Sequence, residues 1–194
     1  MDKFSYALGL GLGRNLKDLG VESVNVEDFA NGINDYLSGK EPAIADAEAR
    51  DIVNKKFTEL QNMKDAKAKE AGENFLEENA KKPNVKTLPS GLQYEILTEG
   101  NGKQPKASDQ VKCHYEGTLI DGTLFDSSIK RGQPAVFGVN QVIKGWVEAL
   151  QLMKEGSKWR LFIPSELGYG AQGAGEMIPP HSTLIFEVEL IQVL

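Results

Sequence analysis

The stretch "VKCHYEGTLIDGTLFDSS", residues 111–128, decides the fold of the second half of the chain. Its alternation places Val111, Cys113 and Tyr115 on one face of a strand, as expected where one face of a sheet is buried. The Asp-Gly pair at 121–122 is a typical hairpin turn. We therefore predict two antiparallel strands joined at this pair.

Two aspartates in this stretch have different expected roles. Asp121 belongs to the turn, where its side chain lies in water. Asp126 follows Leu124 and Phe125, in a segment that is expected to face a core. The residues of this stretch alone do not explain why a carboxylate stands there.

The rest of the second half predicts more strands and one short helix. Three further stretches alternate apolar and polar residues, and they are "GLQYEILTEG" (91–100), "SKWRLFIP" (157–164) and "STLIFEVELIQVL" (182–194). The stretch "GWVEALQLM" (145–153) instead has helical spacing, with Trp146 on its apolar face. The fold class is therefore α+β, with an antiparallel sheet packed on one helix.

Composition divides the chain near residue 80. Residues 1–80 hold 10 Lys and Arg against 16 Asp and Glu, with one proline, whereas residues 81–194 hold 12 of each charge and seven prolines. An acidic, proline-poor first part indicates helices, and a turn-rich second part indicates strands. We expect a helical domain at 1–45, a long linker helix at 46–82 and a sheet domain at 83–194.

Three helices are expected in the first part. Phe4, Leu8 and Leu12 begin an apolar face that ends before Gly20, and Asn25 is a plausible N-cap for the second helix. The third runs from about residue 46 toward residue 82, and a helix of about 35 residues is about 50 Å long. Its later stretch, "NMKDAKAKEAGENFLEENAKK" (62–82), is expected to be a solvated helix face.

The first part is too small to bury its own apolar faces. Domains of fewer than about 40 residues usually need help from a metal, a disulfide or another chain. We therefore expect a homodimer joined through residues 1 to about 60, with the long helix as a stalk.

Several kinds of site are disfavoured by composition. The single cysteine excludes an internal disulfide, and two histidines make a histidine-rich metal site improbable. The net charge of −6 gives no indication of nucleic acid as a partner, and no apolar run approaches the about 20 residues that span a membrane. The glycines at 9–13 lack the spacing of a nucleotide-binding loop. We expect a cytoplasmic protein, or a periplasmic one if a signal segment was removed.

Four stretches together resemble FKBP-type peptidyl-prolyl cis–trans isomerases. They are "VKCHYEGTLIDGTLFDSS", "QPAVFGVNQVIKGWVEALQLMKEGSKWRLFIP", "LGYG" and "MIPPHSTLIFEVELI", which occur in the family's order and cover nearly all of residues 88–194. The helical first part resembles the dimerisation arm and stalk of the Mip-like (macrophage infectivity potentiator) bacterial branch. The resemblance implies proline-containing polypeptide clients and macrolide inhibitors as ligands, and it implies no cofactor and no metal.

The resemblance also implies a pocket that takes a proline ring. Its floor matches Trp146, and its walls match Tyr115, Phe125, Val142, Ile143 and Phe186. The family's buried aspartate matches Asp126, which either orients Tyr115 or acts electrostatically on the rotating amide; we assign it orientation. The Tyr169 hydroxyl and the Ile143 backbone N–H match the groups that hold carbonyls of the ligand.

Some positions depart from the best-known members. Ala174 stands where histidine is often found, Ala135 where an aromatic is common, and Met177 where a branched aliphatic residue is usual. These departures concern substrate preference and inhibitor affinity. The leading function is isomerisation of X-Pro bonds in unfolded or folding proteins, and the rival is a chaperone-like module that binds clients between the arms of a dimer. A catalytically silent scaffold is a weaker third hypothesis.

Overall fold

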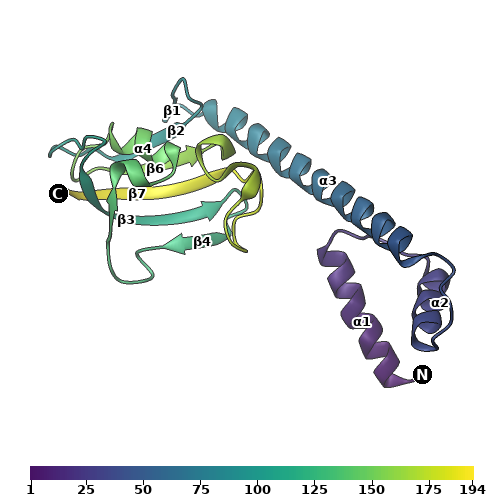
Figure 1. The fold of residues 1–194 in the computed structure, drawn as a ribbon. Coiled ribbons are helices and arrows are strands. Elements are labelled where there is room, and N and C mark those ends of the chain that lie inside the picture. Colours follow the sequence, from purple (N-terminus) through teal and green to yellow (C-terminus); the bar gives the residue numbers. More distant parts are fainter. The chain divides into compact units, whose positions relative to one another are not determined.

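A computed structural model describes residues 1–194, and the chain divides into two compact units, Met1–Ala66 and Lys67–Leu194 (Figure 1). The α-helices are α1 (Lys3–Asp18), α2 (Val26–Leu37), α3 (Asp46–Ala80) and α4 (Lys144–Leu150). Three short 3₁₀ turns are η1 (Val139–Gln141), η2 (Ser165–Leu167) and η3 (Gly170–Gln172). None of the helices combines the length and the apolar composition that crossing a bilayer would need.

The first unit consists of α1, α2 and the beginning of α3. The Asp2 side chain caps α1 by accepting a hydrogen bond of 2.7 Å from the Ser5 N–H. Asn25 caps α2 by accepting from the N–H groups of Glu27 and Asp28, so the predicted N-cap is confirmed. No residue of this unit is buried. The helices therefore form from local signals, and their apolar faces lack a cover within the chain.

The second unit is built on a seven-stranded antiparallel sheet. Its strands are β1 (Val85–Thr87), β2 (Gln93–Thr98), β3 (Gln110–Leu119), β4 (Leu124–Ser127), β5 (Ala135–Gly138), β6 (Lys158–Ile163) and β7 (Leu184–Val193). The order is β1-β2-β6-β7-β3-β4, and β5 pairs with β3 beside β4. The predicted turn at 121–122 joins β3 to β4, and the expected α+β class is confirmed. The short strands β1 and β5 were not expected as separate elements.

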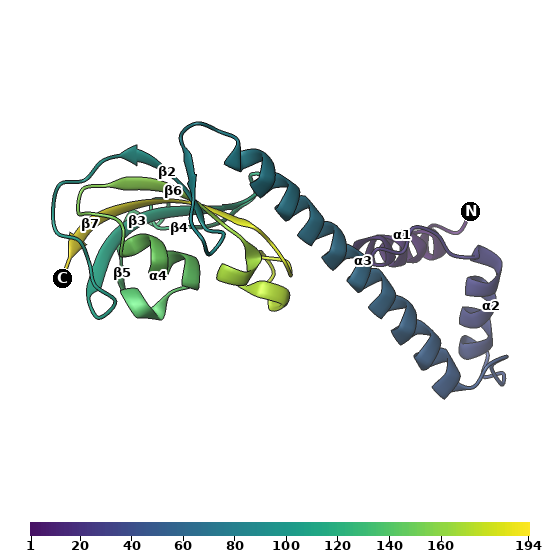
Figure 2. The same cartoon turned by 90° about the horizontal axis from the view of Figure 1, so that it is seen from above.

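The core of this unit lies between the sheet and α4, which runs along one sheet face (Figure 2). The predicted alternation is confirmed in β6, where Trp159, Leu161 and Ile163 are buried in the core. The β7 residues expected on one face are buried as well, and they are Leu184, Phe186, Val188 and Leu190. Burying each large apolar side chain stabilises the fold by about 1.5–3 kcal/mol.

The expectation of a solvated helix at 62–82 is wrong for its last part. Gly72 and Asn79 of α3 are buried, and the Phe75 ring lies 6.0 Å from the Phe162 ring. Phe162 alternates with the core residues of β6, so its side chain lies on the opposite face of the sheet. The end of α3 covers that face. The contact could not be predicted from the composition of residues 62–82, because this segment is mostly polar and only a narrow stripe of the helix packs on the sheet.

A buried polar pair fixes the end of α3 to the sheet. The Asn79 side-chain amide donates to the Gln93 side-chain oxygen at 2.8 Å, and the Gln93 amide donates to the Leu76 carbonyl at 2.8 Å. Buried polar groups that are hydrogen-bonded in this way specify one packing geometry. The last turns of α3 therefore belong physically to the second unit.

Candidate active site

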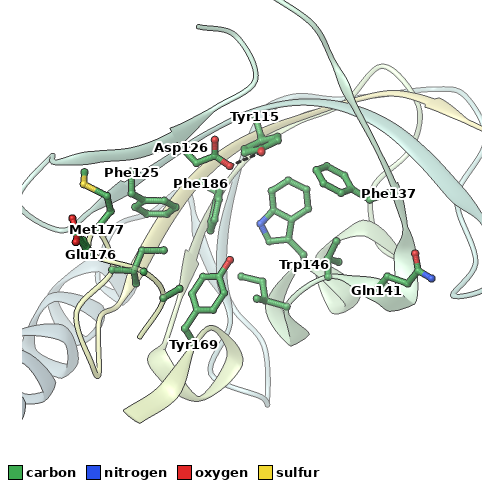
Figure 3. Close-up of a pocket in the computed structure, with 15 residues that line it drawn as sticks. Tyr115, Phe125, Asp126, Phe137, Gln141, Trp146, Tyr169, Glu176, Met177 and Phe186 are labelled. Carbon is green, nitrogen blue, oxygen red and sulfur yellow. Dashed lines mark hydrogen bonds between the residues drawn. The ribbon is translucent and has the colours of Figure 1, made fainter. Parts of the chain in front are cut away.

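A cavity of about 660 Å³ opens between the sheet, α4 and the loop that precedes β7. All eight residues predicted for the site line it, and they are Tyr115, Phe125, Asp126, Val142, Ile143, Trp146, Tyr169 and Phe186. The other lining residues are Phe137, Gln141, Ala174, Gly175, Glu176, Met177 and Ile178. Figure 3 shows that the labelled side chains converge on this space from several elements. The fold thus brings together residues that lie up to 71 positions apart.

Trp146 of α4 is the centre of an aromatic cluster. Its ring meets the rings of Tyr115, Phe137 and Phe186 edge to face, with centroids 5.4, 5.6 and 5.3 Å apart. Such geometry is favourable for aromatic pairs and fixes the rings in place. The indole Nε1 is buried and has no hydrogen-bond partner. An unpaired buried donor costs about 1–3 kcal/mol, and the fold tolerates this cost at the pocket floor.

Gly117 of β3 makes room for two of the aromatic walls. A Cβ atom at this position would lie 2.5 Å from the Phe125 ring and 2.7 Å from the Phe186 ring. Those two rings are 5.3 Å apart and edge to face. Only a residue without a side chain allows both rings to approach the strand this closely. Sequence reasoning missed this role of Gly117.

The Tyr115 hydroxyl is held by two charged partners. It donates to an Asp126 carboxylate oxygen at 2.5 Å and accepts from the Arg131 guanidinium at 2.7 Å. Arg131 also pairs with the other Asp126 oxygen and lies 5.6 Å from the Tyr115 ring centroid. The hydroxyl hydrogen is therefore already engaged. This network fits the orienting role that was predicted for Asp126.

The same network shifts the pKa values of its members. Burial would raise the pKa of Asp126, but hydrogen bonds from Tyr115 and Arg131 and the Arg131 charge together lower it. Burial, followed by the hydrogen bond to Asp126, raises the pKa of Tyr115. At neutral pH the carboxyl is therefore ionised and the phenol is protonated. The bond to Asp126 requires both of these states.

Tyr169 differs from Tyr115 in having a free hydroxyl. It lies between η2 and η3, is 39% exposed, and forms no side-chain hydrogen bond within the protein. Burial, and then the nearby Asp126 charge, raises the pKa of Tyr169, so its hydroxyl remains a donor. Ile143 is the extended N-cap residue of α4 and also lines the cavity. Both residues that were expected to hold carbonyls of a ligand therefore line the cavity.

Two supporting residues were not predicted. Ser128 is fully buried, and its hydroxyl accepts from the Tyr115 N–H at 2.8 Å while its own N–H donates to the Tyr115 carbonyl at 3.0 Å. Arg131, described above, is the second. Ser128 is the last residue of the stretch 111–128 that resembles the family, whereas Arg131 lies outside the resembling stretches. The only available indication for Arg131 was that a half-buried carboxylate such as Asp126 needs a cation nearby.

The positions that depart from the family pattern differ in their relation to the cavity. Ala174 and Met177 line it, whereas Ala135 belongs to β5 and packs at the edge of the core. Cys113 is buried, and burial raises its pKa to about 12, so its thiol is inert at neutral pH. No three His, Cys, Asp or Glu side chains are grouped so that they could hold a metal ion.

Both parts of the chain match known family models. A model described as "FKBP-type peptidyl-prolyl cis-trans isomerase" matches residues 101–191. A second, described as "Domain amino terminal to FKBP-type peptidyl-prolyl isomerase", matches residues 1–96. The two matches together cover most of the chain, in the order expected from the resemblance.

Individual relatives match along nearly the whole chain. The FKBP-type 22 kDa peptidyl-prolyl cis-trans isomerase of Escherichia coli is 48% identical over 197 residues, which cover 98% of this chain and 94% of that protein. The outer membrane protein MIP of Legionella longbeachae is 44% identical, with 99% of this chain and 85% of that protein covered. The crystal structure of FkpA from Escherichia coli superimposes with a TM-score of 0.77 at 36% identity, covering 98% of this chain and 95% of that one. The chain therefore belongs to the FKBP-type peptidyl-prolyl cis–trans isomerases.

Proposed function

We propose that the aromatic cavity of the second unit is the place where this isomerase rotates X-Pro bonds, in unfolded or folding proteins. The observation that carries the proposal is the edge-to-face cluster of Trp146 with Tyr115 and Phe186, which walls a cavity large enough for a proline ring. The polar groups beside it are few, and the Tyr115 hydroxyl is already occupied.

The reaction needs no nucleophile. Amide resonance gives a rotation barrier of about 18–20 kcal/mol, and cis and trans X-Pro bonds differ by only about 0.5–1 kcal/mol. Twisting the amide removes the resonance and makes the bond less polar. Water favours the planar, more polar form, and a dry aromatic cavity removes that bias. Each 1.36 kcal/mol of preference for the twisted form increases the rate about tenfold.

The polar groups then serve to hold the client. In our proposal the Ile143 N–H and the Tyr169 hydroxyl bind carbonyls that flank the proline, so that one side of the bond stays fixed while the other turns. Asp126 acts by orienting Tyr115. Val142 and Phe125 complete the walls, and macrolide inhibitors would occupy the same cavity.

The test is an isomerisation assay with the full chain on a proline-containing tetrapeptide. Trp146→Ala should lower kcat/KM by about tenfold or more because it removes the floor, and Tyr169→Phe should lower it less because it removes one hydrogen bond. Circular dichroism must show that both variants are folded. If the X-Pro bond of the tetrapeptide isomerises at its spontaneous rate in the presence of the wild-type chain, the proposal is refuted.

A second proposed function is chaperone-like client binding by a homodimer. It is supported by the first unit, in which Leu8 and Leu12 of the α1 face are 53% and 43% exposed, and by the match of a family model to residues 1–96. Uncovered apolar faces of this kind mark interaction surfaces. We propose that residues 1–45 join two copies, that 46–82 link them to the sheet domain at 83–194, and that clients bind between the arms.

Leu12→Glu tests this second function. It should halve the molecular mass in sedimentation and remove most of the rate gain on a refolding protein, while a tetrapeptide is still isomerised. Arg14→Gln is the matched control, because it changes the net charge equally but lies about 200° around α1 at 3.6 residues per turn. If Leu12→Glu stays dimeric, the assignment of the dimer interface to α1 fails.

The cellular location is also a proposal. The chain was expected to be cytoplasmic, with the periplasm as the alternative. One relative carries the name outer membrane protein MIP, which favours the periplasmic alternative over the cytoplasmic one.

A further inference from the structure

A tight turn in the loop before β7 forms one wall of the cavity. Ala174 and Ile178 pair through two backbone hydrogen bonds of 2.8 and 3.1 Å. Gly173 and Gly175 adopt φ values of 63° and 55°, which glycine adopts without strain. Glu176 lies near the tip of this closed turn. Its backbone is therefore held in place at the cavity, although its side chain is exposed.

Glu176 is an uncompensated charge at the cavity. Only two of the lining residues are charged, Asp126 and Glu176. Asp126 is neutralised by its ion pair with Arg131, whereas Glu176 has no ion pair and no side-chain hydrogen bond. Lys144, which follows the lining residue Ile143, is exposed and does not line the cavity. The cavity mouth therefore carries one unpaired negative charge.

The position of Glu176 gives the cavity an acidic end. In Figure 3, Glu176 lies with Met177 on the side of Phe125, and Gln141 lies at the opposite side beyond the Trp146 indole. A polypeptide that places its proline ring over the indole and extends along the cavity would carry a neighbouring residue toward Glu176. The charge of that neighbouring residue would therefore interact with the Glu176 carboxylate.

We propose that Glu176 is a specificity-determining residue that favours client segments with Lys or Arg beside the proline. This inference rests on the proposed site. Exposed ion pairs are weak, so the expected preference is about two- to fivefold in kcat/KM. It should shrink at about 1 M salt, where the screening length is about 3 Å.

The experiment uses the full chain and a protease-free assay, because a coupling protease has charge preferences of its own. Two peptide series place Lys, Ala or Glu directly before or directly after the proline. We expect the Lys peptide to exceed the Glu peptide by about two- to fivefold in at least one series. Glu176→Gln should bring that ratio close to one, and Glu176→Lys should reverse it. The series that responds identifies which side of the proline faces Glu176.

Glu99→Gln is the control variant. Glu99 is exposed, lies in the loop after β2, lines no part of the cavity, and forms no ion pair. Its replacement changes the net charge as Glu176→Gln does, so a ratio that moves equally in both variants would overturn the inference. Equal rates for Lys and Glu peptides in both series would also overturn it, while turnover of the Ala peptide would leave the proposed site standing. If the wild type isomerises none of the peptides, both the Glu176 inference and the proposed site are refuted.

Discussion

The two units differ in how far their large apolar side chains are buried. In the second unit Leu161 and Val188 are completely buried, whereas Leu8 and Leu12 of the first unit are 53% and 43% exposed. Both sets come from clear apolar patterns in the sequence. A pattern therefore predicts which face is apolar, but what covers that face depends on the rest of the molecule. In the second unit the cover is within the chain, and in the first we propose that it is a second copy.

The largest expected effect of this difference is on stability. Leu161→Ala should lower the free energy of unfolding of the second unit by about 2–5 kcal/mol, because it empties a filled core position. Leu12→Ala should leave that transition unchanged. Both tryptophans, Trp146 and Trp159, lie in the second unit, so tryptophan fluorescence during urea unfolding reports on this unit alone. An equal loss in the two variants would show that the units are not energetically separate.

A smaller effect separates two aspartates within the second unit. Asp126→Val should lower turnover by about tenfold, equivalent to about 1.4 kcal/mol, because Tyr115 loses its acceptor. Stability should fall by less than this, because Asp126 is at the cavity edge with 41% of its side chain exposed. Asp121→Ala is the control, since Asp121 only accepts from the Thr123 N–H in the solvated turn. A folded Asp126→Val variant with full activity would exclude the orienting role.

Two helical glycines provide a third contrast. A Cβ atom at Gly72 would lie 2.4 Å from the Thr183 hydroxyl oxygen, whereas nothing lies within 4 Å of one at Gly32 in α2. Gly→Ala favours a helix by about 1 kcal/mol, but overpacking costs about 1–3 kcal/mol. Gly72→Ala should therefore destabilise the second unit by up to about 2 kcal/mol, and Gly32→Ala should not. Urea unfolding of both variants provides the measurement, and a stabilised Gly72→Ala protein would contradict the packing of α3 on this unit.

The smallest effect is a pH dependence. Hydrogen bonds from Arg160 and Lys158 lower the pKa of Glu187 from its ordinary value of 4.5. A lowered pKa contributes stability that is fully present above 4.5 and is lost as pH falls through the folded value below it. The free energy of unfolding, measured by tryptophan fluorescence, should therefore fall as the pH is lowered below 4.5. In the Glu187→Gln variant this fall should be smaller. The pKa of Asp2 is also lowered, by its bonds with Ser5, but Asp2→Asn in the first unit should leave the fluorescence profile unchanged.

Much of the candidate site could be predicted, because its residues lie in stretches that resemble one family. The eight predicted residues indeed converge on one cavity. The residues that support them could not be predicted. Arg131 lies outside the resembling stretches. Gly117 and Ser128 lie inside one, but their roles depend on contacts with the Phe125 and Phe186 rings and with the Tyr115 backbone, which exist only in the folded chain.

By itself the sequence determined the local structure: helices where apolar residues repeat every three or four positions, strands where they alternate, and a cap at Asn25. These features depend on neighbours in the chain, so they can be derived from it. Only the tertiary structure decided that the polar end of α3 packs on the sheet through Phe75, and that Glu176 lies unpaired at the cavity. Such contacts join residues far apart in the chain, and their energy depends on distances that only the folded backbone sets.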